Sequence, residues 1–434
     1  NEQRYDTIVQ ALFSAVTLLP DYTIVHKQDV YMKKKYVAEK SDGLLQEAYE
    51  RHFDGREYLD HRCRLFLIFS SKKNVRGASS GLLGISAGGS MPKAEALARY
   101  AAMAEQFATV VQGCGLLEMR RLTEDDIFGV GDSPGLIQDY LNFTDEGEDV
   151  LSDIQLRRDR VRTGDRYIGC HLIADLDQLP AEVASCRKVT SLSTDSSVVN
   201  LSFLNEIGQE LDCEHIVNHF ILKEPQKDIH GELDTRRRQM LSMAGRSAEN
   251  RMYSEELNEF LEETATEQMH TVRFHINVLA GGTANEFESV KDKVVSAVSR
   301  MGVTPVYDIY DTPCQFWASI PGNEAGLAYQ EYMTADLKVA LCMGIYDGFE
   351  PGVPDGVMKM SDRLRLVPQR FDIQEKALEM GLIENYNVFL LGPSGSGKSF
   401  FMNKYLKSCY DAGQHVFLID VGDSYRALCN IIKE

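Results

Sequence analysis

One glycine-rich stretch has residue types and spacing that predict chemistry with phosphate groups. Residues 392–399 read GPSGSGKS, which fits the pattern G-x-x-x-x-G-K-S of a phosphate-binding loop. Its glycines let backbone N–H groups curl around an anion, because they carry no Cβ atom that would clash. We expect Lys398 to reach the β- and γ-phosphates of a nucleoside triphosphate such as ATP, and the Ser399 hydroxyl to ligate Mg²⁺.

The elements expected on either side of this loop agree with that interpretation. An apolar run at 388–391 predicts a strand, and residues 400–406 predict the start of an amphipathic helix. A strand followed by the loop and a helix places the phosphates at a helix N-terminus, whose partial positive charge attracts them. A chance glycine turn before a lysine is the alternative, and both flanks disfavour it. Lys398 is the predicted catalytic residue, and the predicted nucleotide-binding residues are Gly392, Pro393, Ser394, Gly395, Ser396, Gly397, Lys398, Ser399 and Phe400.

A second candidate for the magnesium site follows the expected helix. The apolar run at 415–419 ends in Asp420. In kinases and GTPases an aspartate at the end of a neighbouring strand holds Mg²⁺ through water. In hexameric motor ATPases the strand after the first helix is instead structural or carries an auxiliary acidic residue. Asp420 therefore has two interpretations, a magnesium ligand through water or a structural residue.

Length and charge limit the classes of protein and partner. A chain of 434 residues is long enough for two or three domains. Its 46 basic and 65 acidic side chains give a net charge of −19, which repels nucleic acid and anionic membranes, so we predict no direct DNA binding. Nine residues of each sign lie in 361–434, so the acidic excess, 37 against 56, precedes that segment. The nine cysteines lack paired spacing and indicate reduced thiols in a cytosolic protein.

The elements that must position the loop fall into two regions. Residues 1–355 alternate predicted helices and strands, which predicts an α+β docking domain with its own core, formed as one domain or as two subdomains. Near 228–270 a long charged helical stretch predicts an insertion, either a protruding hairpin or two solvated helix faces. Turn-forming residues at 349–356 predict a linker. Residues 361–434 would then form the first βαβ portion of a P-loop NTPase domain.

Three other patterns contain residue types found in functional sites, but a structural role or a chance match explains each of them better. The sequence GISAG at 84–88 matches a hydrolase nucleophile motif but lacks the strand and helix that the motif requires on its two sides. Five arginines within 157–166 are expected to pair with this acidic chain's own carboxylates rather than to grip phosphates. Cys213, His215 and His219 lie in a strand-like segment without a second ligand pair, which disfavours zinc.

Several stretches carry a resemblance to one protein family. Residues 387–401, NVFLLGPSGSGKSFF, closely resemble the TraG-type conjugation ATPases of conjugative transposons, which are large ATPases of type IV secretion systems. So do HVFLID at 415–420 and the SY and LCN that follow within 424–430. Upstream, VHKQD at 25–29 and FWASIPGN at 316–323 also resemble sequence segments of that family's N-terminal region. The resemblance thus spans nearly the whole chain.

This resemblance implies a motor that works with a secretion channel. The α+β domain would dock onto channel proteins at the inner membrane, and a RecA-like P-loop ATPase domain would follow, truncated here after its first βαβ portion. The protein would be cytoplasmic, peripherally attached to the inner membrane and a homo-oligomer, hexameric in the family. ATP and Mg²⁺ would energise pilus assembly and DNA or protein transfer. The Walker B pair and arginine finger are expected beyond Glu434, so we expect this piece alone to be inactive in hydrolysis.

Two other functions stay open at this point. The acidic N-terminal region could be a docking scaffold whose nucleotide site acts as a switch without catalysis. A P-loop kinase with Asp420 as magnesium ligand is the other alternative, and it would need a lid and an acceptor site within the 35 residues after Ser399. The sequence leaves open the transferred substrate, the oligomeric state, and whether the printed residues join pieces of a longer chain.

Overall fold

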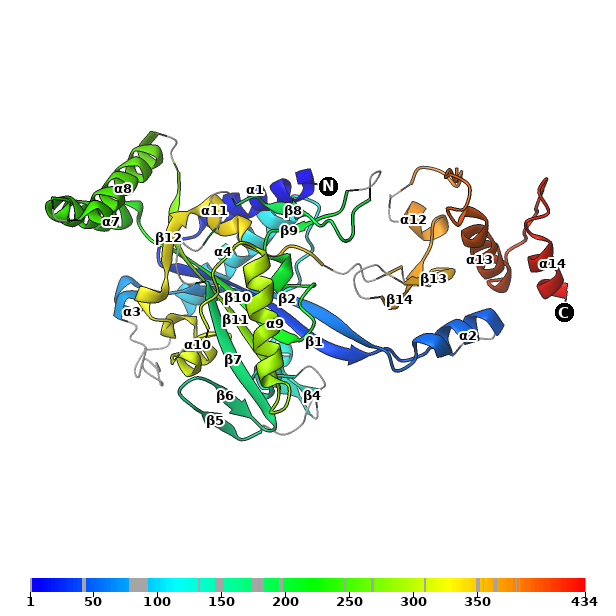
Figure 1. Ribbon diagram of the computed structural model, residues 1–434, viewed down its shortest axis with the longest axis horizontal. Helices are drawn as coiled ribbons and strands as arrows, with labels where there is room; N and C mark the ends of the chain where they lie inside the picture. The colour runs from blue at the N-terminus through cyan, green and yellow to red at the C-terminus, as the bar shows by residue number, and fades with distance from the viewer. Residues whose placement is uncertain are drawn as a thin grey trace. The chain divides into compact units, whose positions relative to one another are not determined.

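The apolar strands before the expected linker pair into one antiparallel sheet of eight strands (Figure 1). Seven strands follow the order β2-β1-β10-β11-β7-β6-β5, and β12 pairs with the first residues of β11. The strands of this sheet are β1 (Thr23–Lys35), β2 (Glu57–Phe69), β5 (Ile154–Leu156), β6 (Val161–Thr163), β7 (Arg166–Ile173), β10 (Glu214–Lys223), β11 (Thr271–Thr283) and β12 (Met333–Asp336). The mixture of helices and strands expected for this region is confirmed, and its main sheet is antiparallel.

The computed structural model describes most of the chain and divides it into two units. The described residues are 2–40, 44–77, 93–131, 133–144, 152–173, 179, 183–194, 198–245, 247–266, 269–307, 310–348, 352–353, 355–361, 366–379, 381 and 383–433. One unit contains residues 1–32 and 59–347, and the other contains residues 33–58 and 348–434. The GISAG sequence at 84–88 lies outside the described residues.

Helices cover both faces of the sheet, so its central strands are buried along most of their length. Alternate residues of β11 point to opposite faces, which is the period of a strand. Phe274 and Ile276 pack on one face against a first set of helices. Leu279 packs on the other face with Tyr140 and Phe316, which belong to a second set. The first set is α1 (Glu2–Leu18), α4 (Ala94–Gln112), α9 (Phe287–Arg300) and α11 (Leu337–Cys342). The second set is α3 (Lys72–Gly77), α6 (Leu136–Asn142) and α10 (Thr312–Ala318).

A helical hairpin lies where the charged insertion was expected. Its helices are α7 (Gln226–Met243) and α8 (Ala248–Thr266), and in Figure 1 the pair extends away from the sheet. Few of its side chains are buried, among them Ile229 and Leu233 of α7. The smaller elements of this unit are α5 (Glu124–Phe128), β3 (Gly129–Val130), β4 (Ser133–Pro134), β8 (Cys186–Lys188), β9 (Asn200–Ser202), η2 (Asn205–Ile207), η3 (Glu324–Gly326) and η4 (Tyr329–Glu331).

The second unit combines the C-terminal part of the chain with a segment from near its start. Residues 33–58, called the arm below, comprise the outer ends of β1 and β2 with the helix between them. The helices and strands of this unit are α2 (Leu44–Phe53), β13 (Met358–Ser361), β14 (Pro368–Phe371), α12 (Glu375–Glu379), α13 (Lys398–Asp411) and α14 (Arg426–Lys433). Its small apolar core joins Met358 of β13 to Tyr405 and Cys409 of α13.

Several expected strands are missing from the described residues. The runs at 388–391 and 415–420, which were expected to form strands, lie outside any helix or strand. These strand predictions were wrong for one physical reason. Strand character depends on a hydrogen-bonded neighbour, and an apolar run does not specify one.

The arginine-rich ribbon and the histidine pair behave as ordinary parts of this fold. In the ribbon Arg160 pairs with Asp159 and Arg166 pairs with Glu214, so carboxylates of the chain itself accept these side chains. In β10 the ring of His215 contacts the carbonyl oxygen of Cys213 at 2.8 Å. Burial lowers the pKa of His215 to about 4, so its imidazole is neutral at pH 7.

Candidate nucleotide-binding site

The glycine loop leads directly into the N-terminus of α13. Gly397 is the N-cap residue of this helix and has a φ of +86°, while Gly395 has a φ of +81°. Residues with a Cβ atom adopt such angles only at a cost in free energy, so glycine suits both positions. At Gly392 a Cβ atom would lie 2.7 Å from the Ser396 hydroxyl oxygen. The glycines therefore permit the tight path of the loop.

The side chain of Lys398 folds back over this loop. Its Nζ atom donates to the carbonyl oxygens of Gly392 and Pro393, both at 2.6 Å. It also lies 3.5 Å from the hydroxyl of Ser396. The ammonium group is thus held by carbonyl oxygens of the loop itself. A phosphate oxygen is a stronger partner for an ammonium than a neutral carbonyl, so an anion can take over these hydrogen bonds.

The first turn of α13 supplies the remaining donors. Because the helix begins at Lys398, the backbone N–H groups of Lys398, Ser399 and Phe400 have no acceptor within the helix. These N–H groups and the helix dipole favour an anion at this end. The hydroxyl of Ser399, in this first turn, is an oxygen ligand of the kind that Mg²⁺ prefers. The donor set therefore fits the triphosphate and the magnesium ion predicted from the sequence.

Asp420 caps the turn that follows its own segment. Its two carboxylate oxygens accept hydrogen bonds from the N–H groups of Gly422 at 3.0 Å and Tyr425 at 3.2 Å. The turn reaches α13 through Asn403, whose amide donates to the carbonyl oxygens of Ser399 at 2.8 Å and Ser424 at 3.5 Å. Asp420 thus has a structural role, and its role toward magnesium stays a prediction. The sequence analysis did not single out Asn403.

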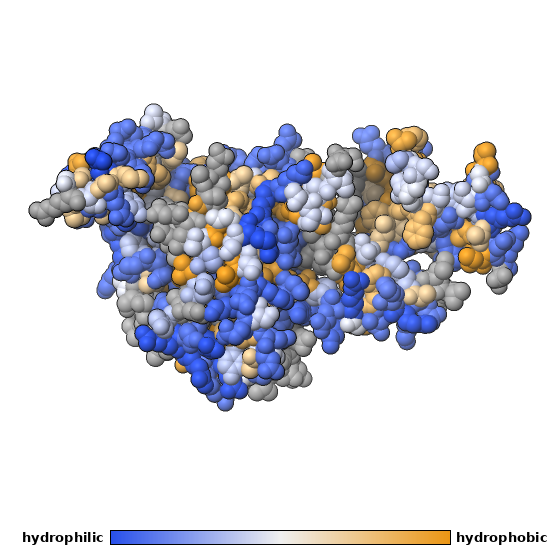
Figure 2. Space-filling view, in the orientation of Figure 1, coloured by the Kyte–Doolittle hydropathy of each residue, from blue (hydrophilic) through white to orange (hydrophobic). Residues whose placement is uncertain are grey.

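Apolar side chains next to the loop are open to solvent. Phe389 and Leu391, just before the loop, are 87% and 82% exposed, and Phe417 and Ile419, in the later run, are 97% and 95% exposed. Figure 2 shows apolar residues on the surface of this part of the chain. Such large exposed apolar side chains indicate a surface suited to packing against other protein.

Within the second unit, an ion-pair cluster joins the arm to β13. The sequence analysis did not predict this cluster. Lys359 of β13 lies 2.7 Å from Glu50 of α2 and 3.0 Å from Glu39, and the side chains of Lys359 and Glu50 are only 5% and 3% exposed. Tyr36 donates to Glu50 at 2.8 Å. Burial alone would raise the pKa of Glu50, but hydrogen bonds from Lys359, the Glu39 N–H and Tyr36 lower it. The cluster joins residues more than 300 positions apart, so no local pattern could have revealed it.

Residues 25–29 and 316–323, the two upstream segments that resemble the TraG-type family, contact each other in the unit that contains the eight-stranded sheet. Gln28 of the first stretch donates to the carbonyl oxygen of Ser319 in the second, at 3.1 Å. Gln28 also donates to Asn218 at 2.9 Å, and Asn218 donates to Asn277 at 2.8 Å. All these side chains are buried, and they form a polar row across β1, β10 and β11. The row holds α10 on the sheet and supplies no open site.

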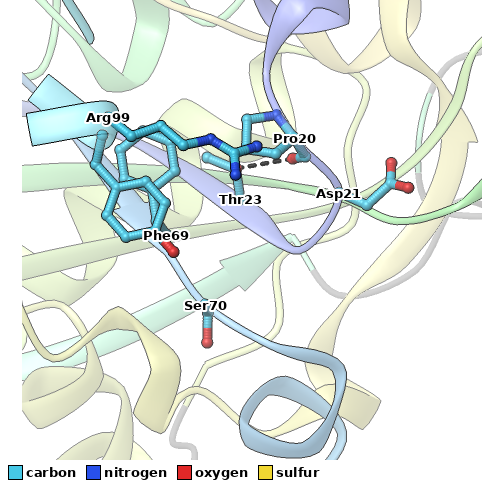
Figure 3. Close-up of a pocket in the computed structure, with 7 residues that line it drawn as sticks. Pro20, Asp21, Thr23, Phe69, Ser70 and Arg99 are labelled. Atoms are coloured by element: carbon cyan, nitrogen blue, oxygen red, sulfur yellow. Dashed lines mark hydrogen bonds between the residues drawn. The ribbon is translucent and has the colours of Figure 1, made fainter. Parts of the chain in front are cut away.

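A separate pocket in the sheet unit is too small for a nucleotide. It measures about 100 Å³, whereas sites for small molecules usually measure at least 300 Å³. Figure 3 shows the carboxylate of Asp21 pointing away from the guanidinium of Arg99. The residues that line this pocket are Pro20, Asp21, Thr23, Phe69, Ser70, Arg99 and Tyr100. The described residues therefore leave the glycine loop as the better candidate.

The loop, its lysine and the helix N-terminus define the class of P-loop nucleotide-binding proteins. A comparison with protein families places the segment within that class. Residues 357–434 match the model of the TraG P-loop domain, so this segment is a TraG-type P-loop domain. The match confirms the expected resemblance for this segment and indicates a conjugation-related P-loop ATPase. A comparison with curated proteins found no match to the chain.

Proposed function

We propose that this chain is the docking and nucleotide-binding part of an ATP-driven motor in a conjugative type IV secretion apparatus. The observation that carries the proposal is the glycine loop at the N-terminus of α13, with Lys398 held over it, in a segment that matches the TraG P-loop domain. ATP hydrolysis in the complete motor would energise pilus assembly and the transfer of DNA or protein. The resident metal would be Mg²⁺, held by Ser399, where it would neutralise charge on the phosphates.

The chain's own residues would perform binding and orientation. The N–H groups at the start of α13 would hold the β-phosphate, and Lys398 would move from the loop carbonyls to the β- and γ-phosphate oxygens. Phe400, which is 79% exposed, would flank the bound phosphates. A RecA-like sheet is the architecture that we propose for the complete domain. The match of residues 357–434 to the TraG P-loop domain supports this proposal.

We further propose that the sheet unit docks onto other secretion-channel proteins. The motor would lie in the cytoplasm at the inner membrane and work as a ring of identical subunits. No helix among the described residues has the length and apolar content needed to cross a membrane. The acidic excess before the P-loop segment favours basic protein surfaces as partners over nucleic acid.

Nucleotide binding to this chain tests the proposal. Calorimetry with Mg²⁺ and a non-hydrolysable ATP analogue should detect binding to the wild type. Lys398→Ala should weaken it roughly 10- to 100-fold, because charge-assisted hydrogen bonds are each worth about 1.5–3 kcal/mol. Lys407→Ala on the same helix is the matched control, since Lys407 pairs with Asp411 and should leave binding unchanged. Equal binding by wild type and Lys398→Ala would refute the assignment of the loop.

A further inference from the structure

The arm touches the helix that begins at the phosphate loop. Lys404 of α13 places its Nζ atom 3.9 Å from the centroid of the Tyr49 ring, which belongs to α2. An ammonium over the face of an aromatic ring is attracted by the negative charge of that face, and more strongly where water is excluded. Burial lowers the pKa of Lys404, although nearby Glu50 opposes the shift, so the ammonium is partly dehydrated here.

A second route joins the same two helices through β13. Neighbouring residues of a strand point in opposite directions. Met358 packs against Tyr405 of α13, whereas Lys359 binds Glu50 of α2. The strand is therefore sandwiched between α13 and α2. A shift of α13 would be felt by α2 both directly at Tyr49 and indirectly at Glu50.

The geometry connects these contacts to the phosphate loop on one side and to the sheet on the other. Lys404 lies six residues after Lys398, or about 9 Å along the helix axis. The arm continues without a break into β1 and β2, which are strands of the eight-stranded sheet.

We propose that α2 senses the occupancy of the phosphate loop, with Tyr49 and Lys404 as positioning residues of the coupling. The inference rests on the proposed nucleotide binding and adds how that site is regulated. A bound triphosphate fixes the first turn of α13, which strengthens the contact of Lys404 with Tyr49 and holds the arm in its docked state. Without a ligand the arm is released more often. By linkage, a docked arm raises the affinity of the loop for nucleotide by the same factor.

Hydrogen exchange measured on the whole chain tests the coupling. A non-hydrolysable ATP analogue with Mg²⁺ should slow exchange in residues 44–53 of the wild type about fivefold or more, which is the lower end of typical allosteric couplings. Tyr49→Leu and Lys404→Ala should abolish this slowing. They should also weaken binding of the analogue by a similar factor, measured by calorimetry. Tyr49→Phe keeps the aromatic ring and should behave as the wild type.

Two ion pairs within single helices provide matched controls. Lys407→Ala removes the pair with Asp411 on α13, and Arg51→Ala removes the pair with Glu47 on α2. Both variants should keep the slowing and the affinity of the wild type. A variant such as Tyr49→Leu could release the arm even without nucleotide. The proposal then still requires that this variant binds the ATP analogue more weakly than the wild type. An unchanged affinity in that variant would overturn the coupling.

The outcomes separate this proposal from the proposed function. Binding of the analogue with unchanged exchange in residues 44–53 would overturn the coupling and leave the nucleotide site standing. Loss of slowing in Lys407→Ala as well as Lys404→Ala would also overturn it, because the effect would not depend on Tyr49. If the wild type binds no analogue, both proposals fail.

Discussion

Gly397 controls the direction in which the chain leaves the phosphate loop and enters α13. Its φ of +86° is in the left-handed region, and a Cβ atom there would meet nothing within 4 Å. The need for glycine is therefore one of backbone conformation and not of space. Gly413, just after α13, has a nearly identical φ of +82° and equally open surroundings. This pair allows the function of the loop to be separated from the stability of the unit.

We expect Gly397→Ala and Gly413→Ala to lower the free energy of unfolding by about 1–2 kcal/mol each, because alanine is strained in the left-handed region. Only Gly397→Ala should also weaken nucleotide binding, since it alone distorts the loop. Urea unfolding and calorimetry with an ATP analogue measure the two effects. Similar nucleotide affinities for the two variants would contradict the role given to Gly397.

At the scale of elements, an ion-pair cluster joins the arm to β13 and β14, and its central pair, Lys359 and Glu50, is buried. The carboxylates of Glu50 and Glu39 meet the ammonium of Lys359, and Arg370 adds a contact to Glu39 at 2.5 Å. The other charged or titratable groups near Glu50 are Tyr36, Tyr49 and Lys404. Breaking a buried pair leaves an uncompensated charge, so the cluster makes the docked arm sensitive to pH.

Acid should release the arm. Burial opposes the shift, but the hydrogen bonds with Lys359 and the neighbouring groups lower the pKa values of Glu50 and Glu39 from their usual 4.5. Their stabilisation is therefore present above pH 4.5 and lost as the pH falls through the lowered values. Protection factors for exchange in α2, measured from pH 7 to pH 3, should fall in that range. Glu50→Gln should flatten this dependence, and an unchanged acid profile in that variant would refute the explanation.

The same cluster predicts the alkaline behaviour of the arm. Burial alone would lower the pKa of Lys359, but its hydrogen bonds to Glu50, Tyr36 and Glu39 raise it above 10.5. Its stabilisation is therefore complete below pH 10.5 and is lost as the pH rises through the raised value. The arm should be most firmly attached between these two limits.

The polar row across three strands should be costly to interrupt. Asn218→Leu would remove one hydrogen-bond partner each from Gln28, His26 and Asn277. The His26 Nε2 and Asn277 Oδ1 atoms would then be buried without the partner that they have in the wild type. We expect a loss of roughly 3 kcal/mol or more in the free energy of unfolding, measured with urea. Asn250→Leu on α8, at a partly exposed position, should stay within about 0.5 kcal/mol. Equal effects of the two changes would show that the row is not cooperative.

At the scale of the whole molecule, net charge decides which large partners are accessible. The chain carries −19, and the arginines at 157–166 that could have formed a basic patch are largely engaged. Arg160 and Arg166 pair with carboxylates, Arg162 donates to the carbonyl oxygen of Gly164, and Arg158 lies over the ring of Tyr310. These contacts engage the arginines within the chain itself, and the absence of a nucleic-acid site on the ribbon stays a prediction.

We therefore expect no binding to duplex DNA. Fluorescence anisotropy of a labelled duplex should stay constant up to roughly 10 μM protein at about 0.15 M salt, because a polyanion is repelled by this charge. A salt-dependent rise in anisotropy with the isolated chain would contradict the prediction, and alanine replacements at Arg157 and Arg158 would then show whether the ribbon causes it.

The sequence by itself determined the features that depend on neighbouring residues. The loop at 392–399, the helix that follows it and the helical hairpin near 228–270 could be predicted, because glycine conformation and helical periodicity are local properties. The alternation of helices and strands before the linker could also be predicted, and β1, β7, β10 and β11 lie in that region. The nucleotide-binding residues themselves stay predictions until a ligand is measured.

Only the tertiary structure decided which distant segments meet. It placed Glu50 against Lys359 and Tyr49 against Lys404, brought Gln28 to Ser319, and left the runs at 388–391 and 415–420 outside any strand. These outcomes depend on partners hundreds of residues away. An ion pair or a strand exists only when its partner is in place, and periodicity along one segment carries no information about that partner.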